Sequence, residues 1–80
     1  MPLQHHPLSR EFPELKDALR RLVSEDGHFA RLVEEYEELD KRIYEVESGR
    51  VAMDELMLAG LKMQRVGLKD ELADKMRAAG

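Results

Sequence analysis

The chain has 80 residues, of which 38% are charged and 5% aromatic, and it contains no cysteine. This length allows one small domain, and the absence of cysteine excludes disulfides, thiolate metal sites and thiol nucleophiles. The net charge of −4 includes no strongly basic segment, and the longest apolar run is far too short to span a membrane. With no secretion-signal pattern at the start, we expect a soluble cytoplasmic protein without a membrane partner.

Residues 1–12 carry Pro2 and Pro7 among scattered polar residues and show no hydrophobic periodicity. This pattern predicts a flexible N-terminal tail, followed by a single helical domain over residues 13–80. His5 and His6 are adjacent in the tail, but no third ligand lies nearby in the sequence. We therefore expect no metal site there.

A first, short helix is predicted over about residues 13–25. Pro13 suits a first helical position, because its missing N–H would have no partner there. Leu15, Leu19 and Leu22 then fall on one apolar face. Asp26 and Gly27 interrupt the pattern, and the sequence allows either a corner or a kink; we expect a corner capped by Asp26.

A second helix is predicted over about residues 27–48. Within residues 29–46 the apolar side chains are spaced three and four apart, which is typical of a helix packed along another helix. Gly49 suits the left-handed residue that ends many helices. A linker over residues 49–52 is short, so the next helix is expected to return antiparallel.

The third helix is predicted over about residues 53–78 and has two apolar faces. One face should pack on the second helix, and its members are Leu58, Leu61, Leu68, Leu72 and Met76. The opposite face is a possible protein-contact face, and its members are Leu56, Ala59, Gly60, Met63, Val66, Gly67 and Ala73. The first helix, another copy of the chain, or both could cover it.

Gly60 and Gly67 are seven residues apart on this second face. Glycine is unfavourable inside a helix, so the pair indicates either close approach of another backbone or drift at an exposed site, and we favour close approach. The methionines at 53, 57, 63 and 76 are expected to fill the core rather than to form an adaptable docking surface.

Folding the hairpin at residues 49–52 pairs positions whose numbers sum to about 100. Leu39 is then expected opposite Leu61, Leu32 opposite Leu68 and Phe29 opposite Leu72. Arg65 interrupts the apolar seam and is expected near Tyr36, over its ring or reaching Glu35 or Glu37.

The sequence contains no convincing catalytic set. The acidic run is expected to form a solvated, salt-bridging face rather than a buried carboxylate site; its members are Glu34, Glu35, Glu37, Glu38 and Asp40. His28 is expected on the surface in a first helical turn. No serine–histidine–acid set, Gly-rich phosphate loop or zinc pattern is present, so we expect no enzyme activity, no catalytic or metal residues and no cofactor.

Several motifs together resemble the YdcH-like family of small bacterial proteins. The quoted residues are Asp26-Gly27-His28-Phe29, Leu32, Tyr36, Leu39-Asp40, Ile43, Glu47, Leu61-Lys62, Arg65 and Leu68-Lys69-Asp70-Glu71. Phe12-Pro13-Glu14 is also similar to some members, whereas Gly27 stands where the family often has proline. The resemblance implies a helical, hairpin-like cytoplasmic protein and supplies no catalytic residue.

The sequence thus predicts an all-α protein, an antiparallel coiled-coil-like helical hairpin with a short N-terminal helix. The expected function is non-enzymatic: a homo-oligomer that acts as an adaptor or as a regulatory partner of another protein. The alternative is a weak nucleic-acid-associated regulator that uses Lys62, Arg65 and Lys69 of the last helix. Nucleic acid is the less favoured partner because the chain is acidic overall.

Overall fold

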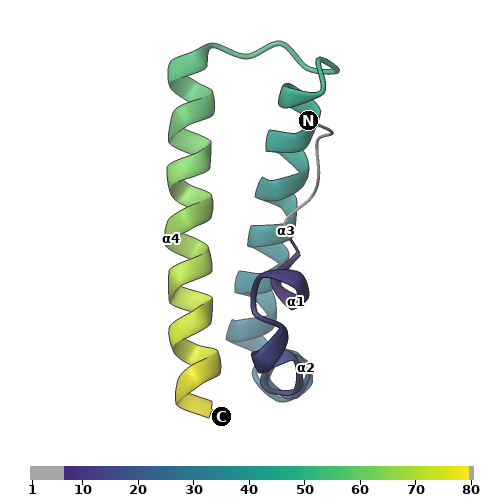
Figure 1. The fold of residues 1–80 in the computed structure, drawn as a ribbon, viewed down its shortest axis with the longest axis vertical. Helices are drawn as coiled ribbons and strands as arrows, with labels where there is room; N and C mark the ends of the chain where they lie inside the picture. The colour runs from purple at the N-terminus through teal and green to yellow at the C-terminus, as the bar shows by residue number, and fades with distance from the viewer. Residues whose placement is uncertain (1–6, 80) are drawn as a thin grey trace.

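The computed structural model describes residues 7–79, and this part of the chain contains helices and no strand. In chain order the elements are α1 (Leu8–Glu11), a short 3₁₀ helix (Pro13–Leu15), α2 (Lys16–Glu25), α3 (Gly27–Glu47) and α4 (Glu55–Ala79). Figure 1 shows α3 and α4 side by side as an antiparallel hairpin, with α1 and α2 gathered at one end. The expected all-α helical hairpin is confirmed.

Gly49 ends α3 through backbone geometry. Its φ of +84° lies in the left-handed region that the sequence predicted for it. The N–H groups of Gly49 and Arg50 donate to the carbonyls of Val46 and Glu45 at 3.1 and 3.0 Å. These are the two hydrogen bonds of a Schellman motif, and they satisfy carbonyls that the end of a helix leaves without partners.

The hairpin linker is longer than predicted, because it covers residues 48–54 rather than 49–52. Asp54 ends it by capping α4: its Oδ1 accepts a hydrogen bond from the Leu56 N–H at 2.7 Å. The ion pairs between α3 and α4 join residues whose numbers sum to 105 and 109, not to about 100.

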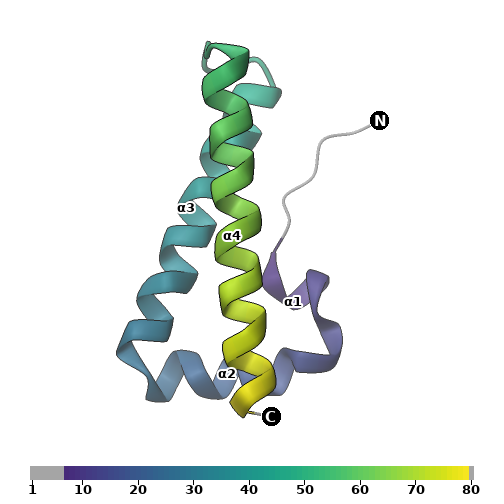
Figure 2. The same ribbon diagram turned by 90° about the vertical axis from the view of Figure 1, so that its left-hand side faces the viewer.

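Asp26 forms a corner between α2 and α3, as expected. Its backbone is extended, with φ −122° and ψ 104°, and its Oδ1 accepts a hydrogen bond from the Phe29 N–H at 3.1 Å. The cap stops one helix and starts the next in a new direction. Figure 2 shows the result, with α2 running crosswise at the base of the hairpin.

Residues 7–12 were predicted to belong to a flexible tail, and for them the structure shows a different arrangement. Leu8 opens the single helical turn of α1 and is buried in the core. The carboxylate of Glu11 lies 3.9 Å from the ammonium of Lys69 on α4, and the guanidinium of Arg77 lies over the Phe12 ring, 5.7 Å from its centroid. The remainder of the predicted tail, residues 1–6, lies outside the described part of the chain.

The main core lies at the end of the hairpin where all four α-helices meet. Its buried members are Leu8, Ala18, Phe29, Leu32, Val33, Tyr36, Leu72 and Met76. The opposite half of the hairpin has less cover, because only α3 lies against α4 there (Figure 1). This asymmetry decides which part of α4 stays exposed.

Candidate functional site

The N-terminal half of α4 presents an exposed face without charge. We call it the outward face of α4, and its members are Leu56, Ala59, Gly60, Met63, Val66 and Gly67. The three large side chains, Leu56, Met63 and Val66, are 82%, 76% and 52% exposed. Ala59 and the two glycines are exposed as well. Large apolar side chains gathered at this exposure are uncommon on a surface that contacts only water.

Ala73 was predicted to share this face, and the structure contradicts that assignment. Only 2% of Ala73 is exposed. It lies near the C-terminal end of α4, where α2 also packs; there the Arg21 Nη2 donates to the Ala79 carbonyl oxygen at 2.7 Å. The helix α2 therefore packs at the last turns of α4, and the outward face in the N-terminal half of α4 stays exposed.

Gly60 and Gly67 have no close neighbour within the described chain. A Cβ built at either glycine would meet no atom within 4 Å. The close approach predicted at these positions is therefore not made by any described element of the same chain. Since glycine is unfavourable inside a helix, the reason for the pair lies either in another molecule or outside packing altogether.

The methionines divide between core and surface. Met76 is completely buried in the core, in agreement with the expected role as core filler. Met57 and Met63, however, are 63% and 76% exposed. Because methionine is flexible and polarisable, these two suit a surface that adapts to a partner.

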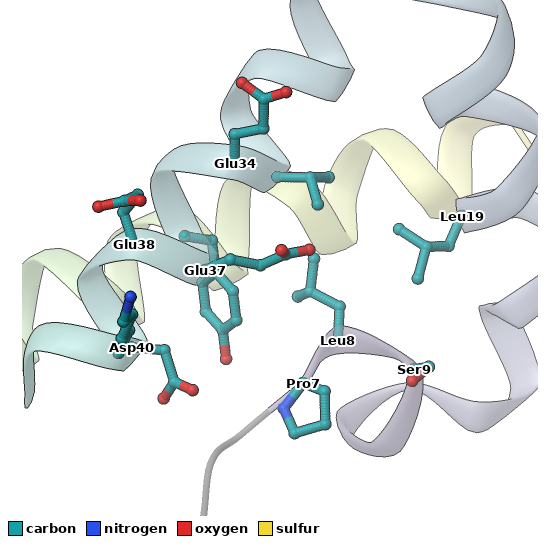
Figure 3. Close-up of a pocket in the computed structure, with 11 residues that line it drawn as sticks. Pro7, Leu8, Ser9, Leu19, Glu34, Glu37, Glu38 and Asp40 are labelled. Carbon is teal, nitrogen blue, oxygen red and sulfur yellow. The ribbon is translucent and has the colours of Figure 1, made fainter. Parts of the chain in front are cut away.

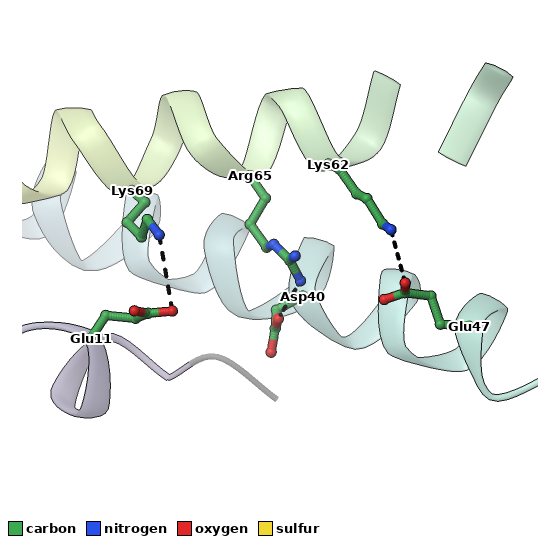
Figure 4. Close-up of polar contacts among 6 residues, drawn as sticks. All are labelled: Glu11, Asp40, Glu47, Lys62, Arg65 and Lys69. Atoms are coloured by element: carbon green, nitrogen blue, oxygen red, sulfur yellow. Dashed lines mark hydrogen bonds and ion pairs between the residues drawn. The ribbon is translucent and has the colours of Figure 1, made fainter. Parts of the chain in front are cut away.

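Three cations of α4 border the outward face and point toward acids of α3 and α1 (Figure 4). Lys62 pairs with Glu47 at 2.8 Å, Arg65 with Asp40 at 2.9 Å and Lys69 with Glu11 at 3.9 Å. Figure 4 shows the three side chains directed toward α3 and α1. These three cations thus pair with acids of the same chain, and Lys62 lies at the edge of the outward face, beside Met63 and Val66.

The pair formed by Arg65 and Asp40 corrects two predictions. Arg65 lies near Tyr36, as expected, but its Nη1 donates to the Asp40 Oδ1 rather than reaching Glu35 or Glu37. Asp40 was expected in a solvated acidic face, yet it is only 5% exposed. The Arg65 side chain reaches Asp40, one turn of α3 beyond Tyr36, and the pairing offsets the cost of removing that carboxylate from water.

Tyr36 lies beside this ion pair and is almost completely buried. Burial, followed by the negative charges of Asp40 and Glu11, raises the pKa of its phenol from 10 to about 12, while Arg65 acts in the opposite direction. The phenol therefore stays protonated at neutral pH. Its position is structural, because the ring belongs to the core cluster.

A groove lies between α1, α2 and α3, with a volume of about 770 Å³. Leu8, Leu19 and Val33 supply apolar lining, while Glu34, Glu37 and Glu38 lie along α3 (Figure 3). These three glutamates are exposed, as predicted for the acidic run. The residues that line the groove include carboxylates and one serine, Ser9, but no histidine or threonine. A serine–histidine–acid set is therefore not assembled there.

Several further features bear on chemistry. Within residues 7–79, no group of three or more His, Cys, Asp or Glu side chains could hold a metal ion. His28 is exposed in the first turn of α3, whereas His5 and His6 lie outside the described residues. No helix in the described range has both the length and the hydropathy needed to cross a membrane.

Sequence reasoning missed Leu8, Asp54 and the burial of Asp40. A four-residue helix such as α1 is too short to show periodicity, so Leu8 gave no usable signal. The N-cap at Asp54 could have been found, because Asp54 is a favoured capping residue two positions before the apolar run that begins at Leu56. Asp40 is four residues after Tyr36 and three before Ile43, which places it within the apolar stripe of α3.

Comparison with known proteins links the chain to one family. The sequence model of a family described as "Protein of unknown function (DUF465)" matches residues 29–75. The matched segment covers most of α3 and α4, including the whole outward face of α4. Neither the curated proteins nor the solved structures gave a match.

Proposed function

This chain belongs to the family described as "Protein of unknown function (DUF465)", and we propose that it acts without catalysis, by binding protein through the outward face of α4. In this proposal the chain is an adaptor or a regulatory partner, and it self-associates. The match covers residues 29–75, which form most of the hairpin. The family description names no role, so the role is inferred from the surface of the hairpin.

The observation that carries the proposal is the separation of charge and apolar surface on α4. Lys62, Arg65 and Lys69 all turn toward acids of α3 and α1. The outward face beside these cations is left apolar and exposed over about three turns, from Leu56 to Gly67. Burying such a surface against another protein is favourable by about 25 cal/mol for each Å² removed from water.

Two finer statements belong to the same proposal. The residues that resemble the YdcH-like family overlap the matched segment over residues 29–72, so we propose that both describe one family of small bacterial proteins. A cytoplasmic location is consistent with a chain without cysteine. Both statements can be checked by finding the native protein in a fractionated bacterial cell.

The test is affinity capture from the native cell, in which the tagged chain and the untagged native copy compete for the same partner protein. The tagged wild type is compared with a variant that carries Met63→Glu, which places a charge in the centre of the outward face. We expect the wild type to retain protein that the variant loses. Gln64→Glu is the matched control, since it adds the same charge one residue away at an exposed position. Equal capture by all three proteins would contradict the proposal.

The second candidate is a nucleic-acid-associated regulator using the same three cations. Its support is their common side of α4, visible in Figure 4, but each cation already lies within 4 Å of a carboxylate of its own chain. A gel-shift titration at low salt tests it, because phosphate contacts give strongly salt-dependent binding. Binding that is lost in Lys62→Gln and Lys69→Gln variants would favour this candidate over protein binding.

A further inference from the structure

The outward face of α4 has a pattern that is nearly symmetric about Met63. Three and four residues before it are Gly60 and Ala59, and three and four after it are Val66 and Gly67. Residues at these separations share one side of a helix, and a two-fold dimer requires the same patch on both copies. Building on the proposed function, we infer that a second copy of the chain covers this face, antiparallel, with Met63 at the two-fold axis.

This arrangement accounts for both glycines. When two α4 helices run antiparallel about Met63, Gly60 of one copy lies opposite Gly67 of the other, and Ala59 lies opposite Val66. Apart from the adjacent residues and the backbone of α4 itself, no atom of the chain lies within 4 Å of a Cβ position at either glycine, so the bare backbone is accessible to a neighbour. Small residues at facing positions let two helices approach closely, and the exposed Met63 side chains then pack against each other.

Charge favours a second copy in the antiparallel direction. Copies of a chain with a net charge of −4 repel each other, so a contact surface that adds no further like charges is favoured. The outward face is such a surface, and it ends at Asp70 and Asp74, one and two turns beyond Gly67. A parallel pair would set Asp70 against Asp70, whereas the antiparallel pair sets Asp70 opposite Leu56.

The size of the face sets the strength of the dimer. Residues 56–67 span roughly 18 Å of helix about 10 Å wide, which is well below the roughly 800 Å² per partner of a standard stable interface. The dimer is therefore expected to dissociate on dilution, with a dissociation constant in the micromolar range or weaker. A low-affinity contact of this kind leaves the face available to another protein that competes for it.

The first experiment is sedimentation equilibrium of the purified full chain from low micromolar to near-millimolar concentration. We expect a reversible monomer–dimer equilibrium for the wild type and for Gln64→Glu. For Met63→Glu we expect a dimer dissociation constant at least tenfold higher, because the substitution places two like charges at the axis. Circular dichroism of each variant checks that the helices remain. A wild type that stays monomeric throughout would overturn the inference.

The second experiment tests whether the two α4 helices run antiparallel. The chain has no natural cysteine, so only the introduced cysteines can form disulfides. Ala59→Cys and Val66→Cys chains are oxidised separately and as an equimolar mixture. The antiparallel dimer predicts a covalent dimer that contains one chain of each kind, identified by mass, with little product from either chain alone. Links between identical positions, without mixed product, would show a parallel dimer and contradict the proposed geometry.

The two proposals fail in different ways. A purified chain that remains monomeric, while capture from the cell still depends on Met63, would mean that another protein is the occupant; the inference would fail and the proposed function would stand. A monomer whose capture is insensitive to Met63→Glu would contradict both. A dimer insensitive to Met63→Glu would contradict the location of the interface on α4.

Discussion

At the scale of single residues, the least replaceable polar contact is the ion pair between Asp40 and Arg65. The carboxylate side chain of Asp40 is 7% exposed and the guanidinium of Arg65 is 18% exposed, at a distance of 2.9 Å. A buried carboxylate that loses its partner is strongly unfavourable, whereas an exposed ion pair contributes little. The ion pairs that α4 makes through Arg65 and Lys62 therefore contribute very different amounts to the free energy of unfolding.

We predict that Arg65→Met lowers the free energy of unfolding by about 2–3 kcal/mol, because it leaves the Asp40 carboxylate buried without its cation. Lys62→Met is the control, since its ion pair with Glu47 is largely exposed, and it should cost less than about 1 kcal/mol. Urea denaturation of both variants measures the difference. Similar losses in both variants would mean that the burial of Asp40 has no energetic consequence.

Tyr36 gives the protein a predicted sensitivity to alkaline pH. Its pKa is raised from 10 to about 12 in the folded chain, so the folded state holds the phenol proton more tightly than the unfolded state. The resulting stability is complete below about pH 10 and is lost as the pH rises toward about 12. Two pKa units correspond to roughly 2–3 kcal/mol.

The measurement is the free energy of unfolding as a function of pH, for the wild type and for Tyr36→Phe. Phenylalanine keeps the ring in the core but has no proton to lose, so the difference between the two curves isolates Tyr36 from the lysines and arginines. We expect the wild type to lose stability relative to the variant above pH 10. Parallel curves would show that the phenol is not coupled to folding.

At the scale of helices and turns, Gly27 and Gly49 each border α3 but serve it differently. Gly49 has a φ of +84°, whereas Gly27 has no positive φ, and a Cβ at Gly27 would meet nothing within 4 Å. We predict that Gly49→Ala destabilises the hairpin by about 1–2 kcal/mol through left-handed strain. Gly27→Ala should be neutral or stabilise it by up to about 1 kcal/mol, because it restricts the unfolded chain. In thermal unfolding, Gly49→Ala should lower the midpoint, whereas Gly27→Ala should leave it unchanged or raise it.

The same elements explain how far the sequence could lead. The regular apolar spacing of residues 29–46 and the glycine at 49 specify α3 and its end, because both signals are local. The two apolar sides of α4 indicated a partner surface, and six of its seven predicted members are exposed. The seventh, Ala73, is buried, and the α4 residues one turn on either side of it, Lys69 and Arg77, contact Glu11 and Phe12 of the N-terminal segment. That segment showed no periodicity in the sequence, so its packing on α4 could not be predicted locally.

Register was harder to predict than helices. The partner of Arg65 depends on the length of the linker, and Asp54 delays the start of α4 beyond the predicted residue 53. Arg65 lies beside Tyr36, as predicted, but its long side chain reaches Asp40, one turn farther along α3. Pairing between helices is therefore a long-range property, which periodicity within either helix does not determine.

At the scale of the whole molecule, stability depends on a core built at one end of the hairpin. Leu8 from α1, Ala18 from α2, Tyr36 from α3 and Leu72 from α4 belong to one buried cluster. A domain of this size has roughly 4–12 kcal/mol of stability in total. The loss of one large core side chain is therefore a considerable fraction of the whole, even when that side chain comes from a helix of four residues.

We predict that Leu8→Ala lowers the free energy of unfolding by about 2–4 kcal/mol, as for other leucines removed from a core. Leu56→Ala is the matched control, because Leu56 is 82% exposed in the single chain, and at low protein concentration it should change stability by less than about 0.5 kcal/mol. Urea denaturation at low and high protein concentration measures both. If copies pair through α4, the effect of Leu56→Ala grows with concentration, since dimer formation stabilises the folded chain by mass action, whereas the effect of Leu8→Ala does not. Equal effects at low concentration would show that α1 is not part of the folded unit, as the lack of periodicity in residues 1–12 first indicated.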